Sequence, residues 1–216
     1  MSNLSDQLRK SLLEQNVENQ LDAQLLNAAI SLVFVQGAET PNETKQGKWS
    51  NMQLLFMQRA EHPKDPWSGH IAFPGGGVES FDGNTLSAAI RETHEEMGFV
   101  LSQESWVGGM KPIYGPVLGN QKEVCVYPHV FLLDKMPVLE LNEEAQSAFW
   151  VPIDRLMVEK FVFDFEHPFK PDQKMYGIDL GLNLDAPLWG LSLSVLYNFF
   201  QVAGWPVEQE MITFYS

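Results

Sequence analysis

The sequence has few of the residues that cross-link, secrete or anchor a protein. Cys125 is the one cysteine among 216 residues, so no internal disulfide can form and no pair of cysteines can hold a metal ion. The longest apolar runs, such as residues 28–35, are too short to cross a bilayer. Residues 1–10 lack the apolar segment of a secretory signal. We therefore expect a cytoplasmic protein with no membrane partner.

Lys and Arg are also scarce. The chain has 14 of them against 28 Asp and Glu, which gives a formal net charge of −14. Nucleic-acid backbones and anionic lipid surfaces repel a protein with this charge, so we expect no nucleic acid partner. A small anionic substrate would need a metal cation or a local basic patch in order to bind.

The sequence does contain enough apolar material for one sizeable core. Hydrophobic residues make up 44% of the chain and aromatic residues 12%, as in an ordinary globular domain. We expect a helical extension over residues 1–27, a main domain over residues 28–204 and a tail over residues 205–216. Two roles are open to the extension, pairing the chain into a homodimer or covering a sheet.

Apolar periodicity and turn residues predict a mixture of strands and helices. We expect strands over residues 28–35, 52–60, 70–73, 104–113, 123–133, 148–151, 161–165 and 174–180. We expect helices over residues 3–16, 84–97, 152–157 and 187–204, and a hairpin loop over residues 38–51. The apolar side of the first helix is expected to hold Leu4, Leu8, Leu12 and Leu13. This mixture predicts an α/β or α+β sandwich.

The helix expected over residues 84–97 has two unlike faces. With about 100° of rotation per residue, one face carries the mainly apolar set Leu86, Ala89, Ile90, Thr93 and Met97. The opposite face carries three carboxylates, Glu92, Glu95 and Glu96, with Arg91 beside them. We expect the first face to meet the core and the second to lie away from it.

The crowding of carboxylates at this helix end is locally unfavourable. Glu92 and Glu96 lie four residues apart, where like charges destabilise a helix by about 0.2–0.5 kcal/mol, and the helix dipole also disfavours anions there. A glycine run, Gly75–Gly77, lies upstream and permits close backbone approach. A solvated helix face is the alternative, but clustered local conflict is typical of a functional site. Such carboxylates predict bound Mg²⁺ or Mn²⁺, which bridge protein oxygens to substrate phosphates.

The stretch "GGVESFDGNTLSAAIRETHEEMGF" resembles the signature of the Nudix hydrolase family, G-x5-E-x7-R-E-U-x-E-E-x-G-U, where U is a bulky aliphatic residue. The R-E-x-x-E-E-x-G core is intact from Arg91 to Gly98. The chain departs from the pattern at Asp82 in place of the first Glu, in one extra residue before Arg91, and at Thr93 in place of the aliphatic residue. The resemblance implies an α/β/α sandwich with a mixed β-sheet and metal-dependent hydrolysis of a nucleotide pyrophosphate.

Three segments resemble one branch of that family, the coenzyme A pyrophosphatase-like proteins: "LLFMQRA", "SGHIAFPGGGVESFD" and "LWGLSLSVL". This resemblance implies cleavage of coenzyme A or acyl-CoA into 3′,5′-ADP and 4′-phosphopantetheine. Lys64 stands near the place of an arginine in that branch, and the loop before Gly69 is one residue longer. ADP-ribose, dinucleoside polyphosphates and damaged nucleotides are therefore alternative substrates, and a nucleotide-binding module without turnover is a further alternative.

The resemblance also implies a set of metal ligands. Glu92 and Glu96 are the expected main ligands of Mg²⁺, with Mn²⁺ as the alternative ion. Glu95 is expected to be a further ligand or to hold a metal-bound water, and the Gly76 carbonyl is expected to be an extra ligand.

The expected catalytic residues are Glu92, Arg91 and Glu95. Arg91 is expected to orient Glu92 or to pair with Asp82, the acid that would buttress it. The general base is left open between Glu92 and a carboxylate from a distant loop, for which Glu143 and Glu144 are the candidates.

Candidates for substrate contact lie before the signature. Arg59 and Lys64 are candidates because guanidinium and ammonium groups pair with phosphate. The backbone of Gly75 and Gly76 is expected to approach the substrate closely. Trp67 is left between stacking on an adenine and packing within its own loop.

Overall fold

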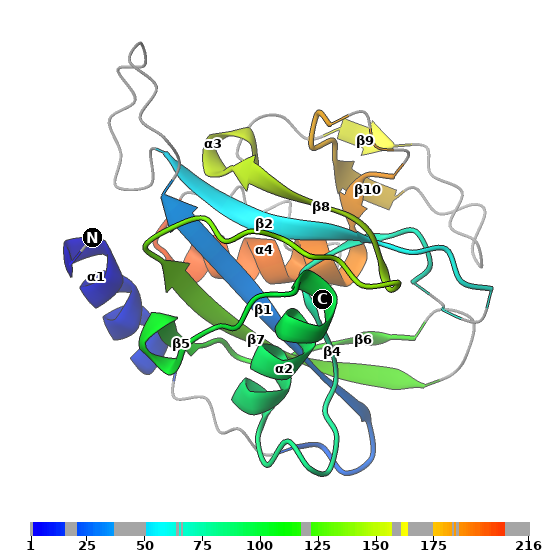
Figure 1. The fold of residues 1–216 in the computed structure, drawn as a ribbon, viewed down its shortest axis with the longest axis horizontal. Helices are drawn as coiled ribbons and strands as arrows, with labels where there is room; N and C mark the ends of the chain where they lie inside the picture. The colour runs from blue at the N-terminus through cyan, green and yellow to red at the C-terminus, as the bar shows by residue number, and fades with distance from the viewer. Residues whose placement is uncertain are drawn as a thin grey trace.

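A mixed β-sheet covered by helices on both faces forms the body of the computed structural model (Figure 1). The structure describes residues 2–15, 21–36, 51–63, 65, 67–117, 122–156, 161–163, 175–182, 184 and 186–205. The helices are α1 (Ser2–Leu13), α2 (Thr85–Met97), α3 (Ile153–Leu156) and α4 (Gly190–Val202), with one 3-10 turn, η1 (Gln103–Ser105). The strands are β1 (Leu26–Gln36), β2 (Met52–Arg59), β3 (Ile71–Ala72), β4 (Gly75–Gly77), β5 (Trp106–Gly109), β6 (Ile113–Pro116), β7 (Glu123–Leu133), β8 (Ala145–Pro152), β9 (Phe161–Phe163), β10 (Met175–Ile178) and β11 (Leu188–Trp189).

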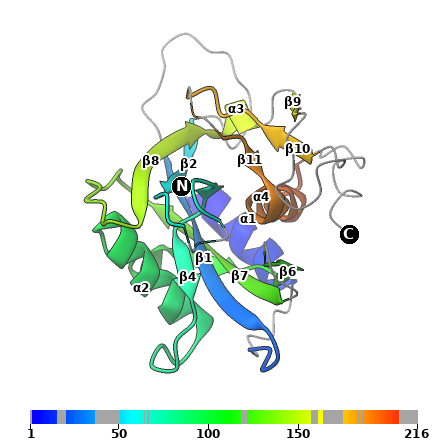
Figure 2. The ribbon, with the colours of Figure 1, turned by 90° about the vertical axis from the view of Figure 1, so that its right-hand side faces the viewer.

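The main sheet has the strand order β3-β2-β1-β7-β5, and β4 also pairs with β1, β6 with β7 and β8 with β2. The β1–β7 pair is parallel, and the other pairs of this sheet are antiparallel. A smaller sheet has the order β11-β10-β9. Figure 2 shows α2 on one side of the main sheet and α1 with α4 on the other. This layered arrangement confirms the predicted α/β/α sandwich with a mixed sheet.

Strand β1 decides which side chains meet which helix, because successive side chains of a strand point to opposite faces. Leu32 and Phe34 belong to the core cluster that includes residues of α1 and α4. Val33 belongs to the cluster that includes Met97 of α2. Ser31 lies on the α2 side as well, where its hydroxyl is fully buried. The buried strand predicted over residues 28–35 is therefore confirmed, with two more residues before it and one after.

Helix α2 begins and ends where the sequence predicts. The Asn84 side chain accepts a hydrogen bond from the backbone N–H of Ser87 at 2.8 Å, which satisfies one of the free donors of the first turn. Gly98 follows the helix with φ of +78°, a left-handed conformation in which glycine is favoured. The N–H groups of Glu140 and Asn142 then donate to the carbonyls of the last turn. The loop before β8 is thereby fixed to the C-terminal end of α2.

Helix α1 packs onto the sheet through a narrower apolar side than predicted. Leu8 and Leu12 are buried in the main core cluster, and a Cβ on Gly108 of β5 would lie 2.8 Å from the Cβ of Leu12. Leu13 is 80% exposed, so placing it on the same side is wrong, because it lies about 100° further round the helix. The side chain of Leu4 lies outside the described residues. Among the helices that the structure describes, none is long and apolar enough to cross a membrane.

The single strand predicted over residues 104–113 is wrong. This region contains η1, then β5, then β6 after a break at residues 110–112. The pairing of β5 with β7 shifts its register between Trp106 and Gly108. Pro112 has no backbone N–H to donate to a sheet. Together these features divide the segment into two short strands that both pair with β7.

Several other boundaries differ from the predicted ones: α1 ends at Leu13, β3 spans Ile71–Ala72 and β10 ends at Ile178. The C-terminal helix begins at Gly190, because Leu188 and Trp189 first pair with β10 as β11. Strand β8 spans Ala145–Pro152, because its whole length pairs with β2. The glycine run is strand β4 and pairs with β1. The hairpin loop expected between β1 and β2 lies largely outside the described residues, but the antiparallel β1–β2 pairing agrees with it.

Candidate functional site

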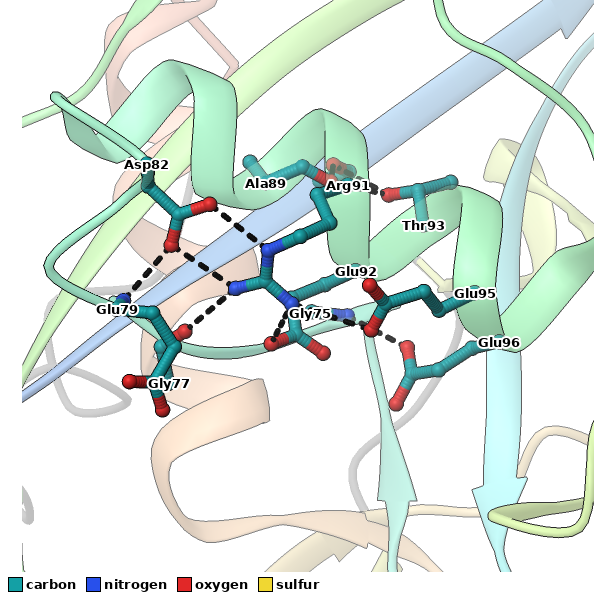
Figure 3. A network of polar contacts seen from close by, with 11 residues as sticks. Gly75, Gly77, Glu79, Asp82, Ala89, Arg91, Glu92, Thr93, Glu95 and Glu96 are labelled. Carbon is teal, nitrogen blue, oxygen red and sulfur yellow. Dashed lines mark hydrogen bonds and ion pairs between the residues drawn. The ribbon is translucent and has the colours of Figure 1, made fainter.

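The candidate site lies where the last two turns of α2 face strand β4 (Figure 3). Gly75, Gly76 and Gly77 pair with Ile30, Ala29 and Ala28 of β1, so the glycine backbone is held in the sheet. A Cβ on Gly76 would lie 2.5 Å from Oε2 of Glu92. The absence of a side chain at this position lets a carboxylate lie directly against the backbone.

Glu96 lies in a different environment from the one predicted. Its side chain is buried, with 1% exposure, and its Oε2 accepts a hydrogen bond from the backbone N–H of Gly75 at 2.8 Å. The prediction that it lies on the face away from the core is wrong, because β4 and the loop before β8 enclose that side of the helix. Burial raises the pKa of Glu96 to about 8, although the Gly75 N–H and the charge of Arg59 lower it.

Glu92 and Glu95 differ in exposure although both contact Arg91. The Glu92 side chain is 14% exposed and the Glu95 side chain 52% exposed. Burial raises the pKa of Glu92, and Arg91 counteracts this shift by a hydrogen bond and by its charge. Negative charge is therefore concentrated where solvent can only partly compensate it.

Arg91 makes five hydrogen bonds, one for each of its N–H groups. Nε and Nη2 donate to the two oxygens of Asp82 at 2.8 and 2.9 Å. Nη1 donates to Glu92 at 2.7 Å and to Glu95 at 3.1 Å, and Nη2 also donates to the Gly77 carbonyl at 3.0 Å. Arg91 therefore contacts Glu92 and pairs with Asp82 at the same time, so the two contacts that the sequence offered as alternatives are both present. One guanidinium joins β4, the loop before α2 and two glutamates.

Asp82 is the acid that holds Arg91 in place. Its side chain is 3% exposed, and its Oδ2 also accepts a hydrogen bond from the backbone N–H of Glu79 at 2.7 Å. The hydrogen bonds from Arg91 hold the pKa of Asp82 below its usual range. Asp82 is shorter than the glutamate of the family signature, and one extra residue separates it from Arg91. The two residues nevertheless form an ion pair with two hydrogen bonds.

The two distal candidates for the general base lie just before β8. Glu143 and Glu144 are both exposed. The Glu144 carbonyl accepts a hydrogen bond from the N–H of Ala60 at 2.8 Å, and the charge of Glu144 raises the pKa values of Glu92 and Glu96. Glu144 is therefore close enough to act electrostatically on both carboxyls.

The cationic candidates are partly described. The Arg59 guanidinium pairs with Asp65, whose Oδ2 accepts from Nε at 2.8 Å and from Nη2 at 2.7 Å. The charge of Arg59 lowers the pKa of Glu96, so Arg59 lies near the carboxylate cluster. Lys64 lies outside the described residues. Trp67 packs against an apolar cluster around β6 and β7 and not only within its own loop.

Sequence reasoning missed a layer of buried polar groups beneath α2. The Thr93 and Ser31 hydroxyls lie 2.8 Å apart, and Nε2 of His129 lies 3.0 Å from the Thr85 hydroxyl. Burial lowers the pKa of His129 to about 4, so the ring is neutral at physiological pH. The sequence signalled this layer only by placing Ser31 and Thr93 within apolar patterns. Such a pattern does not identify the partners of a buried hydroxyl.

The described conformation holds ion pairs rather than a closed metal cage. Within the described ranges, no three His, Cys, Asp or Glu side chains converge closely enough to hold a metal ion. Glu92 and Glu95 direct oxygens at Arg91, and Glu96 directs one at Gly75. These residues nevertheless fit a hard divalent cation, because three carboxylates of α2 lie beside the backbone carbonyls of β4, and both are oxygen donors.

Comparison with known proteins identifies the family. A family model, the NUDIX domain, matches residues 40–172, which is more than half of the 216 residues. The chain therefore belongs to the NUDIX domain family, and the resemblance noted in the sequence is confirmed.

Individual relatives are more distant. An uncharacterised protein of Schizosaccharomyces pombe is 36% identical over 109 residues, which are 49% of this chain and 33% of that protein. The human mitochondrial coenzyme A diphosphatase NUDT8 is 27% identical over 139 residues, or 64% of this chain and 58% of that protein. The chain thus spans less than two thirds of the length of these curated relatives. A solved MutT/nudix family protein from Enterococcus faecalis has a TM-score of 0.52 at 18% identity. The match covers 88% of this chain and 66% of that chain, and it shows the shared fold.

Proposed function

We propose that the chain hydrolyses the pyrophosphate bond of a nucleoside diphosphate linked to a second group, with a divalent cation as cofactor. The observation that carries this proposal is the concentration of negative charge beside β4. Glu92 and Glu95 of α2 both contact the Arg91 guanidinium. Glu96 lies buried against the Gly75 N–H, and its pKa is raised to about 8. A cation bound at this point would compensate the excess charge and would favour the ionised form of Glu96.

Glu92, Glu96, Glu95 and the Gly76 carbonyl are the residues that would hold the cation. Mg²⁺ fits these hard oxygen donors, and Mn²⁺ fits them as well. When bound, the ion supplies charge neutralisation on the phosphates and a lowered pKa for water. Binding would require Glu92 and Glu95 to exchange their contacts with Arg91 for contacts with the ion, at least in part.

The remaining roles follow from charge and position. Arg91 orients Glu92, because the two-point pair with Asp82 fixes the guanidinium. Glu92 and Glu144 are the favoured candidates for the general base, since each is a carboxylate in or beside the cluster, and Glu143 is a further candidate. Glu95 is the most exposed of the three helix carboxylates and completes the ligand set.

We propose coenzyme A or acyl-CoA as the most suitable substrate. Support comes from the segments that resemble the coenzyme A pyrophosphatase-like branch and from the match to the human coenzyme A diphosphatase. The Arg59 guanidinium, and Lys64 in the loop after it, would contact phosphate groups, with the backbone of Gly75 and Gly76 close to the diphosphate. The alternatives are ADP-ribose, dinucleoside polyphosphates or damaged nucleotides, and a binding module without turnover.

Product analysis tests this proposal. The purified protein is incubated with coenzyme A and excess Mg²⁺, in parallel with ADP-ribose, a dinucleoside polyphosphate and dephospho-coenzyme A. Release of 3′,5′-ADP and 4′-phosphopantetheine supports both the chemistry and the substrate. Cleavage of ADP-ribose or the dinucleoside polyphosphate without cleavage of coenzyme A would retain the hydrolase and reject the substrate. No cleavage of any compound with Mg²⁺ or Mn²⁺, despite nucleotide binding, would favour the binding module.

Three further expectations stay predictions. They are a cytoplasmic location, a homodimer, and the division of the chain into residues 1–27, 28–204 and 205–216. Sedimentation of the purified protein tests the homodimer. Limited proteolysis followed by mass spectrometry tests the division.

A further inference from the structure

A pair of buried hydroxyls joins α2 to the centre of the sheet. Ser31 of β1 and Thr93 of α2 are both fully buried, and their side-chain oxygens lie 2.8 Å apart. Both oxygens also lie within hydrogen-bond distance of the Ala89 carbonyl, at 2.7 Å for Thr93 and 3.2 Å for Ser31. Figure 3 shows Thr93 and Ala89 on α2. Thr93 stands where the family signature has an aliphatic residue, so this chain has a directional contact at a position usually reserved for apolar packing.

The same strand residue also fixes the backbone next to the glycines. The N–H of Ser31 donates to the carbonyl of Pro74 at 2.8 Å. The next residue, Gly75, donates its N–H to Glu96 at 2.8 Å. Hydrogen bonds and the backbone together therefore connect Thr93 to Glu96: the Thr93–Ser31 hydroxyl contact, the Ser31–Pro74 backbone bond and the Gly75–Glu96 bond.

The space between α2 and β4 allows little displacement. A Cβ on Gly76 would meet Oε2 of Glu92 at 2.5 Å, and a Cβ on Gly75 would overlap the Ala29 carbonyl of β1. Strand β4 therefore lies in close contact with β1 on one side and with Glu92 on the other. A shift of α2 along β1 by a fraction of an ångström would alter the Glu92–Gly76 contact or the Gly75–Glu96 hydrogen bond.

Apolar side chains at positions 31 and 93 would fix the position of α2 on β1 less precisely than the two hydroxyls do. Apolar burial depends on area and has no preferred direction, whereas a hydrogen bond is restricted in distance and angle. Two hydroxyls that share one carbonyl acceptor thus limit where α2 can rest on β1. The stability of the fold does not require them, since an apolar pair of similar shape can be nearly neutral in free energy.

We propose that the Ser31–Thr93 hydroxyl pair is a positioning device that sets Glu92 and Glu96 of α2 against the backbone of Gly75 and Gly76. The two hydroxyls do not touch the substrate in this proposal and act through the carboxylates. It rests on the proposed hydrolase function for its effect on turnover, but the alignment itself can be measured without substrate.

The test uses the double variant Ser31→Ala/Thr93→Val, which replaces both hydroxyls by apolar groups of similar size. We expect kcat to fall about tenfold or more, since misplacement of a group by about 1 Å can reduce a rate by about a hundredfold. KM should change less than kcat. Amide hydrogen exchange of the metal-free protein should show faster exchange at the Gly75 N–H, because that group loses its fixed partner. The melting temperature should stay close to that of the wild type.

Two further variants separate positioning from structural support. Thr93→Ser keeps the hydroxyl and should retain kcat and the slow exchange of Gly75. Thr85→Val removes another buried hydroxyl of α2, the partner of His129 on β7, and leaves the path to Gly75 intact. It should lower the melting temperature, because His129 loses its partner, while the folded enzyme keeps its kcat and the slow exchange of Gly75.

The outcomes are distinguishable. A double variant with wild-type kcat and wild-type exchange at Gly75 would overturn the proposal. So would a loss of kcat in Thr85→Val that equals the loss in the double variant, since the loss of any buried hydroxyl of α2 would then have the same effect, whether or not it lies on the path to Gly75. If the wild type hydrolyses no nucleotide, the proposed function fails, and the exchange rate of Gly75 still decides whether the hydroxyl pair aligns β4 with α2.

Discussion

Helices α2 and α4 cover opposite faces of one sheet and are held by different forces. The buried side chains of α4 include Leu193, Val195, Leu196 and Phe199, which all belong to the main core cluster. Phe199 packs on Phe34 of β1 with ring centroids 4.8 Å apart. Two polar side chains of α4 bond within the helix: Ser194 donates to the Gly190 carbonyl at 3.1 Å and Asn198 donates to the Ser194 carbonyl at 2.8 Å.

Helix α2 also makes polar side-chain contacts with other elements. Thr93 contacts β1, Thr85 contacts β7, and Arg91 and Glu96 contact β4. Apolar contacts tolerate swaps of similar volume, but a hydrogen-bonded carboxylate loses its partner when either atom moves. The α4 side therefore contributes mainly apolar burial to the fold, whereas the α2 side carries the hydrogen-bonded carboxylates of the candidate site.

The largest expected effect comes from Glu96→Gln. Glutamine keeps an oxygen that can accept from Gly75 but cannot carry the charge of a metal ligand. We expect the protein to fold and kcat to fall by about 10²–10³-fold, as when one preorganised electrostatic group is removed. Glu14→Gln, an exposed control after α1, should be unchanged. Turnover close to wild type in Glu96→Gln would reject Glu96 as a metal ligand.

The corresponding change on the other face is Leu196→Ala. Leu196 is fully buried in the main cluster, so its truncation should lower the free energy of unfolding by about 2–5 kcal/mol. The kcat of the folded enzyme should be retained. Chemical denaturation measures the first quantity and steady-state kinetics the second, with exposed Gln201→Ala as the control. A large loss of kcat without loss of stability would break the contrast between the two helices.

A smaller loss of activity is expected for Gly76→Ala. The added Cβ would meet the Glu92 carboxylate at 2.5 Å, so Glu92 must move while Arg91 still holds it. We expect kcat to fall by about a hundredfold, with a modest change in stability. Gly83→Ala places a Cβ in open space and serves as a control for folding, although its φ of +75° favours glycine. Equal kinetics for Gly76→Ala and wild type would show that close approach at this point is unimportant.

The next effect depends on pH and metal together. The folded pKa of Glu96, about 8, lies above its ordinary value of 4.5. In the metal-free protein its stabilising contribution is complete below the unfolded pKa and is lost as pH rises through about 8. A cation displaces the proton, so stabilisation by Mg²⁺ should grow as pH rises.

Thermal unfolding with and without Mg²⁺ measures this linkage. The rise in melting temperature should be larger at about pH 8.5 than at about pH 6.5, and Glu96→Gln should remove most of the difference. A rise that is independent of pH in the wild type would contradict the role of Glu96 as a ligand that must first ionise.

The smallest effect is expected at the N-terminus of α2. Asn84→Ala removes the side-chain acceptor of the Ser87 N–H and should lower the free energy of unfolding by about 1 kcal/mol. Asn84→Asp keeps the acceptor and should be close to wild type. Since the carboxylates lie at the opposite end of the helix, kcat should be unchanged. A clear loss of kcat in Asn84→Ala would mean that the two ends of α2 are coupled more tightly than the hydrogen bonds indicate.

Much of the site could be predicted because it is local. The bounds of α2 follow from Asn84 and Gly98, and the carboxylates follow from helical spacing. The pairing of Arg91 with Asp82 was also open to prediction, since the two residues are nine positions apart. The boundaries that were wrong, such as the break between β5 and β6, depend on which strand partner each residue meets.

The sequence by itself determined the family, the layered fold and the glutamates of α2, because helix periodicity and motif spacing depend on residues close together in the chain. Only the tertiary structure decided that Glu96 is buried and that Thr93 contacts Ser31, 62 positions away. The physical reason is that helix periodicity determines which residues share a face, but not which other segments pack against that face. Burial and hydrogen-bond partners arise when distant segments pack against those sides, and here β4 and the loop before β8 bury Glu96, whereas Glu95 on the same helix stays exposed.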